Sequence, residues 1–372
     1  MPNVDTQALA TQVLWGAFAL AAVFGAVAQR THFCTMGAVA DIVHMGDWSR
    51  LRMWALSIGV AMLGFNAMVA LGWVEAGKTL YAAPRWTWLS GLVGGLMFGF
   101  GMVLASGCGS KTLVRIGGGN LKSLVVFALL GLSAFATLKG IAAVARVSTL
   151  DRAVLEIPGG QDLPAIVARA VGVGPAPAAL GLGLLIGGAL IAWALGRREG
   201  RSREVLLGGF GIGAVIVAMW WISGVLGHVT EHPETLEEVF LVTNSGRMES
   251  LSFVAPVAYT VDWLLWFSDA SKTLTVGIVS TFGVVAGSAA AALAAGTFRW
   301  EGFGGVEDTA NHVVGALLMG MGGVTALGCT VGQGLSGVST LALGSFAALA
   351  AIVAGALLAL RYQRWRVERE HR

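Results

Sequence analysis

Long apolar runs limit what this chain can fold into more than any other feature. Nine stretches approach the roughly 20 residues that an α-helix needs to cross a bilayer, and more polar segments separate them. They cover residues 8–28, 52–73, 87–105, 122–145, 177–195, 205–226, 272–294, 310–327 and 341–361. The sequence therefore predicts an all-α polytopic membrane protein with about nine transmembrane helices.

Composition excludes the main alternatives. Of the 372 residues, 56% are apolar and 12% are charged, whereas soluble domains carry about 25% charged residues. A disordered chain is excluded as well, because disorder needs low hydrophobicity and high charge. The net charge of +3 is spread over the loops, so no nucleic-acid partner is expected. We predict one integral membrane domain over residues 1–372, in contact with membrane lipid.

Lys and Arg are distributed unevenly between alternate loops. With the N-terminus placed outside, the inner loops and the C-terminal tail carry more than twice as many of these residues as the outer loops. Because positively charged loops stay in the cytoplasm, the N-terminus is predicted outside and the C-terminus inside. The residues before Ala8 include no Lys or Arg. This differs from a secretory signal, so we expect the first run to be a retained helix.

Three Gly-rich segments fit none of the nine runs. Residues 31–46, 107–120 and 328–340 are too short and too polar to cross. Such segments are tolerated at membrane depth only where protein surrounds them or where they line a wet cavity, so short re-entrant helices are predicted. The three cysteines of the chain, Cys34, Cys108 and Cys329, lie one in each segment.

Part of the sequence is repeated. Residues 94–108 resemble residues 315–329 at an offset of 221, and both copies end in Gly-Cys. The copies lie in the third and eighth runs, five spans apart, so they run in opposite directions. The predicted architecture is therefore an inverted repeat, with repeat 1 at about 8–145, a connecting span at about 177–195 and repeat 2 at about 205–361. Inverted repeats with broken helices are typical of transporters, whose site lies at the repeat interface.

The cysteine positions indicate what such a site binds. Their separations match no metal-site spacing, so no metal, cofactor or catalytic residue is expected. A thiol is soft and a weak donor, which suits a sulfur anion, although a single buried cysteine commonly only packs. The breaks also offer backbone N–H groups and positive helix ends to an anion. Supporting residues are predicted beside the thiols at Gly107, Gly109, Lys111, Gly328 and Thr330.

Several of these motifs together resemble the YeeE/YedE family of sulfur-compound transporters. They are residues 30–38 (RTHFCTMGA), Gly107-Cys108-Gly109 and Gly328-Cys329, and the resemblance covers nearly the whole chain. It implies an hourglass-shaped inverted-repeat bundle that takes up thiosulfate across the bacterial inner membrane. It also implies that the three cysteines line the path. A small cytoplasmic sulfur-carrier protein is the partner that the resemblance suggests.

Other interpretations stay open at this point. The loops 147–176 and 227–262 are longer than a compact core needs, which fits an outer vestibule or a different substrate. A selenium-compound or other soft-ion transporter, a membrane thiol oxidoreductase and a structural subunit use the same residue types. No Walker motif occurs, so this chain is not expected to hydrolyse ATP or to be an enzyme. Glu75, Asp262 and Asp269 are the carboxylates near span ends that could couple protons.

Overall fold

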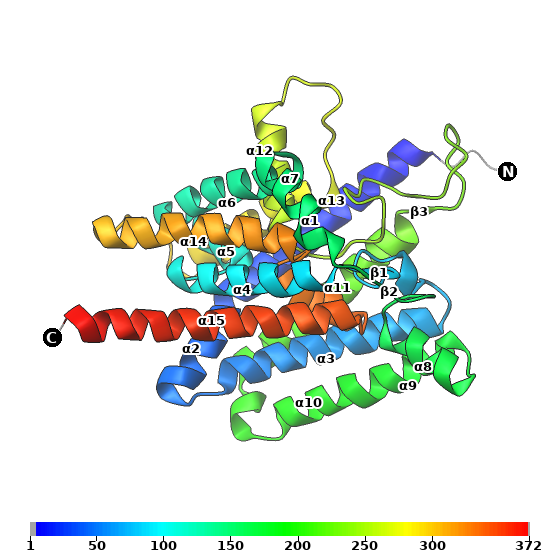
Figure 1. Ribbon diagram of the computed structural model, residues 1–372, viewed down its shortest axis with the longest axis horizontal. Coiled ribbons are helices and arrows are strands. Elements are labelled where there is room, and N and C mark those ends of the chain that lie inside the picture. The colour runs from blue at the N-terminus through cyan, green and yellow to red at the C-terminus, as the bar shows by residue number, and fades with distance from the viewer. Residues whose placement is uncertain (1–4, 371–372) are drawn as a thin grey trace.

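The computed structural model describes residues 5–370, which form a bundle of α-helices (Figure 1). Eight helical segments in this part of the chain are long and apolar enough to cross a membrane. They are Thr6–Met45, Ser49–Ala70, Trp88–Gly117, Leu121–Lys139, Pro175–Leu195, Arg203–Leu226, Val276–Ala294 and Leu343–Arg369. The chain is thus an all-α, multi-pass membrane protein, as predicted.

The element bounds divide these segments further. The helices are α1 (Thr6–Thr31), α2 (Thr35–Met45), α3 (Ser49–Ala70), α4 (Trp88–Leu104), α5 (Gly109–Gly117), α6 (Leu121–Lys139), α7 (Ile141–Ser148), α8 (Leu163–Val171), α9 (Pro175–Leu182), α10 (Gly188–Leu195), α11 (Arg203–Trp221), α12 (Ala255–Leu265), α13 (Val276–Ala294), α14 (Val306–Thr325) and α15 (Leu343–Glu370). Short 3₁₀ turns lie at Ala76–Lys78, Leu150–Arg152 and Arg198–Arg201, and π-helical turns at Gly183–Gly187, Ile222–Leu226 and Gly332–Gly337. Two antiparallel strand pairs, β1 (Arg85–Trp86) with β2 (Leu155–Glu156) and β3 (His228–Val229) with β4 (Val239–Phe240), tie loops together.

Three details differ from the sequence prediction. The expected span at 310–327 forms α14, which has 20 residues but begins with the charged pair Glu307 and Asp308, so it is not among the eight apolar segments. The expected span at 122–145 is wrong at its end, because α6 stops at Lys139 and Gly140 has an extended backbone before α7 begins. The loop expected at 227–262 contains most of α12, an 11-residue helix that starts at a proline-containing turn.

The helices that contain the repeated motif, α4 and α14, cross in opposite directions. A Cβ atom added at Gly94 would lie 2.7 Å from the carbonyl oxygen of Gly322, and one added at Gly101 would lie 2.7 Å from that of Gly315. Gly94 and Gly101 match Gly315 and Gly322 in the repeat, so each contact is the counterpart of the other. This exchange requires antiparallel helices that lie too close for side chains, as an inverted repeat predicts.

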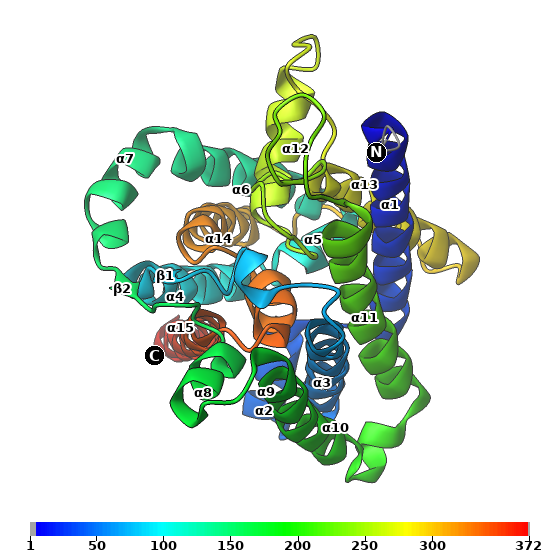
Figure 2. The ribbon, with the colours of Figure 1, turned by 90° about the vertical axis from the view of Figure 1, so that its right-hand side faces the viewer.

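The short helix α5 lies in the middle of the bundle. In the end-on view of Figure 2, α4, α14 and α15 lie on one side and α1, α11 and α13 on the other, with α5 between them. The long helices thus enclose α5, which is too short to cross. The 221-residue offset also places residues 35–45 at 256–266, which is α12 within one residue.

Candidate functional site

Each cysteine stands at the start of a short central helix. Cys34 precedes α2, Cys108 precedes α5, and Cys329 precedes a helical segment over residues 330–339. The carbonyl group of each cysteine accepts the first helical hydrogen bond, from the N–H group four residues on, at 3.0, 2.9 and 2.7 Å respectively. All three thiols therefore lie at the positive ends of helix dipoles, where negative charge is stabilised.

The chain enters each of these helices through the same backbone conformation. His32, Ser106 and Leu327 each lie two residues before a cysteine, and all have a left-handed backbone, with φ of 52°, 56° and 57°. Glycine usually fills this position at a helix end, and other residues adopt it at a cost of roughly 1–2 kcal/mol. The same helix break therefore occurs before each of the three cysteines. Such backbone conformations cluster at functional sites.

The thiols themselves are buried and unoxidised. Cys34 is 7% exposed, Cys108 1% and Cys329 0%, and none forms a disulfide. The N–H groups of Gly37 and Gly332 donate to the sulfur atoms of Cys34 and Cys329, both at 3.4 Å, and the Cys108 sulfur lies 3.2 Å from the Ser110 hydroxyl. The thiols are thus held by main-chain groups and one hydroxyl.

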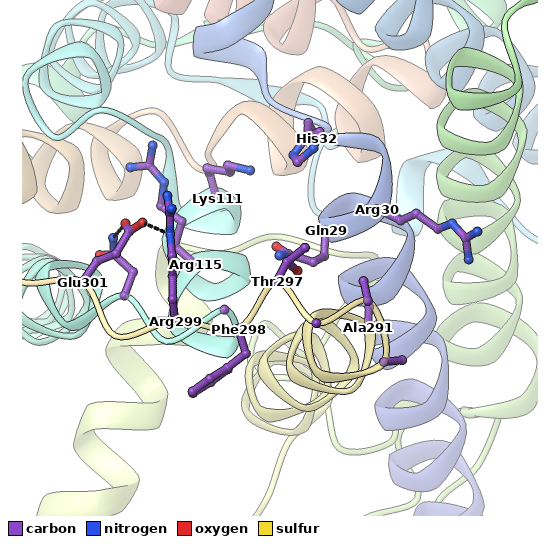
Figure 3. Close-up of a pocket in the computed structure, with 15 residues that line it drawn as sticks. Gln29, Arg30, His32, Lys111, Arg115, Ala291, Thr297, Phe298, Arg299 and Glu301 are labelled. Atoms are coloured by element: carbon purple, nitrogen blue, oxygen red, sulfur yellow. Dashed lines mark hydrogen bonds and ion pairs between the residues drawn. The ribbon is translucent and has the colours of Figure 1, made fainter.

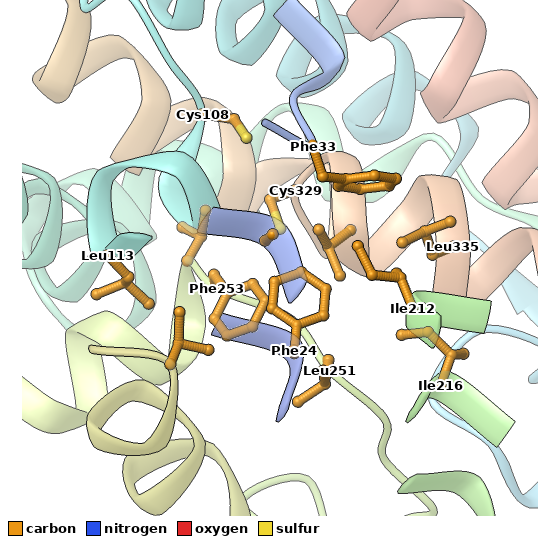
Figure 4. Packing of buried hydrophobic residues seen from close by; sticks show 14 of the residues in the cluster. Phe24, Phe33, Cys108, Leu113, Ile212, Ile216, Leu251, Phe253, Cys329 and Leu335 are labelled. Atoms are coloured by element: carbon orange, nitrogen blue, oxygen red, sulfur yellow. The ribbon is translucent and has the colours of Figure 1, made fainter. Parts of the chain in front are cut away.

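A buried apolar cluster contains Cys108, Cys329 and Phe33, the residue before Cys34. Figure 4 shows Cys108 and Cys329 in the apolar cluster that also contains Phe33 and Phe253. The wet throat expected from the sequence is closed here, because the cysteines are buried and Cys108 and Cys329 belong to an apolar cluster with Phe33 and Phe253.

The predicted supporting residues surround these thiols in different ways. A Cβ atom at Gly109 would lie 2.7 Å from the Phe253 carbonyl oxygen, so only glycine fits at the start of α5. At Gly107 it would approach the Lys111 side chain to 3.1 Å, and at Gly328 it would approach Gln333 to 3.2 Å.

Thr330 and Thr35 both have a buried hydroxyl group without a hydrogen-bond partner among the described residues, and only Thr330 was predicted as a site residue. Thr330 is fully buried and its hydroxyl has no hydrogen-bond partner within residues 5–370. The Thr35 hydroxyl is buried without a partner in the same way, although Thr35 was not among the predicted site residues. The signal for it was the pattern Cys-Thr-x-Gly, which occurs at both Cys34 and Cys329.

A large cavity opens beside Cys34 and Cys108. It has a volume of about 820 Å³, and we call it the basic cavity because Arg30, His32, Lys111, Arg115 and Arg299 line it (Figure 3). His32 and Lys111 point toward each other, whereas Arg30 points away. Within the described residues, Lys111 and Arg115 have no ion-pair partner, whereas Arg299 pairs with Glu301 at 2.6 Å. The cavity thus carries positive charge that the protein does not neutralise.

A second cavity lies at the other end of α13. It has a volume of about 230 Å³, and we call it the Glu249 cavity. Gly277 and Ser280 from the start of α13 line it, whereas Ala291 and Ala294 from the end of α13 line the basic cavity. The wall of the Glu249 cavity includes Gly328, the residue before Cys329. Neither cavity is lined by a cysteine itself, but each is lined by chain neighbours of the cysteines: Gly328 in the Glu249 cavity, and His32 and Lys111 in the basic cavity.

Comparison with known proteins shows the family to which the chain belongs. A family model described as sulphur transport matches residues 30–358. A thiosulfate transporter, TsuA, from Spirochaeta thermophila is 27% identical over 90% of this chain and 94% of its own length. The TsuA of Escherichia coli is 26% identical over 84% of each chain, and a probable transporter of that organism, YedE, is 33% identical over a quarter of this chain and 21% of its own. The chain therefore belongs to the YeeE/YedE family of sulphur transport proteins, as its cysteine motifs predicted.

Proposed function

We propose that this protein takes up thiosulfate, or a closely related sulfur anion, across the bacterial inner membrane. The path runs from the Glu249 cavity past Cys329, Cys108 and Cys34 to the basic cavity. The observation that carries this proposal is that each of the three thiols lies at a helix start, with chain neighbours that line one of the two cavities. Two relatives named as thiosulfate transporters support the choice of substrate.

The main physical problem is the charge of the substrate. Thiosulfate carries two negative charges, and an uncompensated charge at the bilayer centre is very costly. The three helix starts supply N–H groups and positive dipole ends without a full positive charge. Each thiol donates a weak S–H hydrogen bond to the terminal sulfur and keeps its proton. Sites that hold the ion loosely and in series allow it to move on.

Passage requires the apolar cluster to open. Phe33 and Phe253 pack beside the thiols and exclude water from them. Gly107, Gly109 and Gly328 keep the helix starts free of side chains, and the unpartnered Thr330 hydroxyl is a donor for the passing anion. The cluster thus serves as a barrier against other ions and as the contact surface for a soft one.

The basic cavity provides the driving attraction on the cytoplasmic side. We place it there because the predicted orientation has the N-terminus outside and the C-terminus inside, so α1 ends in the cytoplasm beside Arg30. Lys111 and Arg115 then draw the anion inward and release it toward a cytoplasmic acceptor. The proposed acceptor is a small sulfur-carrier protein. Membrane lipid surrounds the bundle. The chain acts as a transporter without catalytic chemistry. The repeats at about 8–145 and 205–361, joined by the span at about 177–195, supply the two halves of the path.

Uptake of labelled thiosulfate tests the proposal. The host strain lacks other thiosulfate importers, and growth with thiosulfate as sole sulfur source gives a second measurement. Cys108→Ala is expected to abolish both, while Cys108→Ser tests whether a hydroxyl donor suffices. Ser133→Ala is the matched control, because Ser133 is a small buried residue of α6 that bonds only within its own helix. Full uptake by Cys108→Ala at normal protein level would refute the thiol path.

The same experiment separates the alternative functions. Competition by selenite stronger than that by thiosulfate would indicate a selenium-compound transporter. Trapping a Cys34–Cys108 disulfide during turnover, without net uptake, would indicate a thiol oxidoreductase.

A further inference from the structure

The three carboxylates that the sequence suggested for proton coupling either form ion pairs with lysines or lie exposed at the surface. Glu75 pairs with Lys78 at 3.2 Å, and Asp262 pairs with Lys272 at 2.6 Å. Asp269 lies in an exposed turn, where the N–H group of Ser271 binds it. None of the three lines either cavity.

Glu249 differs from them because it lines a cavity and is not engaged in an ion pair with the described residues. It lines the cavity whose wall reaches the residue before Cys329, and it has no ion-pair partner within residues 5–370. One carboxylate oxygen accepts the N–H group of Ser245 at 2.7 Å, and its carbonyl group accepts the Ser223 hydroxyl. A partly buried carboxyl group is thus fixed in the wall of the cavity through which the anion enters.

Polar groups without partners share this cavity. The hydroxyl of Ser280, a residue only 2% exposed, and the side-chain oxygen of Asn244 line it and have no hydrogen-bond partner in the described part of the chain. These groups are available to a ligand of the cavity. The cavity therefore has the composition of a binding site, with one ionisable acid in its wall.

We propose that Glu249 is a proton-binding site that controls entry of the anion, which occupies the Glu249 cavity only when this carboxyl group is protonated. This inference rests on the proposed transport function and adds its proton dependence. A carboxylate in the cavity wall would repel a dianion at short range, whereas the neutral acid offers it an O–H donor. By linkage, binding of the anion must then draw a proton onto Glu249.

The surroundings of Glu249 favour the protonated form. Burial raises the pKa of the Glu249 carboxyl, an effect that the N–H groups of Ser245 and Asn244 partly oppose. The other titratable groups that line the cavity are Tyr81, Tyr259 and Arg146, and the Arg146 guanidinium already pairs with Asp151 at 3.2 Å. Asp262, on the same helix as Tyr259, is neutralised by Lys272. No free cation faces Glu249 among the described residues that line this cavity.

The test is thiosulfate uptake into cells as a function of external pH, from about 5 to 8. Thiosulfate keeps both charges over this range, so a change in uptake reports on the protein. Wild-type uptake is expected to be constant at acidic pH and then to fall about tenfold for each pH unit above the pKa of the carboxyl. Glu249→Gln, which keeps the oxygen that accepts the Ser245 N–H group, is expected to remove this fall and retain the acidic-pH rate at pH 8.

A conservative variant and a matched control complete the design. Glu249→Asp keeps an acid and is expected to retain the fall in uptake. Glu234→Gln removes an exposed carboxylate of the same loop and should leave the wild-type profile unchanged. If Glu249→Gln kept the wild-type profile, or if it lost uptake at every pH while its melting temperature in detergent was unchanged, the inference would be wrong. Wild-type uptake that is absent at all pH values contradicts the proposed function, whereas uptake that is present but independent of pH contradicts this inference alone.

Discussion

Replacing Gly109 with Ala tests how tightly the start of α5 is held. The added Cβ atom would lie 2.7 Å from the Phe253 carbonyl oxygen, whereas carbon–oxygen contacts normally begin near about 3.3 Å. Phe253 is 0% exposed and has no free space to move into. Overpacking of this kind costs about 1–3 kcal/mol, and the better helix propensity of Ala returns up to about 1 kcal/mol. We therefore expect a net destabilisation of up to about 3 kcal/mol.

The assay measures thermal unfolding of the purified protein in detergent together with thiosulfate uptake. Gly109→Ala should lower the melting temperature by a few degrees and remove most uptake, because Cys108 directly precedes Gly109 and moves with it. Gly91→Ala is the matched control, since an added Cβ atom at Gly91 in α4 meets nothing within 4 Å. A Gly109→Ala protein with wild-type melting temperature and uptake would show that the contact with Phe253 does not position the thiol.

Two further predictions concern charge. Lys111→Gln removes an unpaired cation from the basic cavity and should raise the KM for thiosulfate about tenfold, which corresponds to roughly 1.4 kcal/mol. Arg197→Gln, at an exposed site, is the control and should leave the KM unchanged. Equal KM values for Lys111→Gln and the wild type would refute the role of Lys111. Hydrogen bonds from Lys78 and then His228 hold the pKa of Glu238 below its usual range. These hydrogen bonds therefore stabilise the folded protein when Glu238 is ionised. The stabilisation is present above the unfolded-state pKa of Glu238 and is lost as the pH falls through its folded-state pKa. Glu238→Gln should therefore lower the melting temperature slightly at pH 7 and not at about pH 3, and a difference that persists in acid would contradict this reasoning.

The long helices and the cysteine-bearing breaks were predictable because both depend on local sequence. An apolar run of about 20 residues has one stable solution in a bilayer, and Gly-Cys ends a run in two places. The opposite directions of α4 and α14 followed from counting spans between the copies. The left-handed backbone at Ser106 and Leu327 was not predicted, because neither residue is a type that signals this conformation.

The second cavity and α12 could not be found in the same way. Val254 stands before α12 where Cys34 stands before α2, so no cysteine marked the fourth short helix. The role of Glu249 depends on its burial beside Ser280, a residue far away in the sequence, and on the ion pairs that engage other acids. Such properties arise from tertiary packing, and a count of acidic residues in a loop contains no information about them.

Main-chain N–H groups hold the thiols of Cys34 and Cys329, and the Ser110 hydroxyl contacts that of Cys108. This arrangement bears on how the protein family can diverge. Peptide N–H groups are the same whatever side chains surround them, so the proposed recognition surface of helix starts and three sulfur atoms would depend on few positions of the chain. Most lipid-facing and loop residues can then change freely, provided that the folds in the backbone persist. If few positions are needed for recognition, relatives can differ widely in sequence. The two TsuA proteins share only about a quarter of their residues with this chain over most of its length, which fits this expectation.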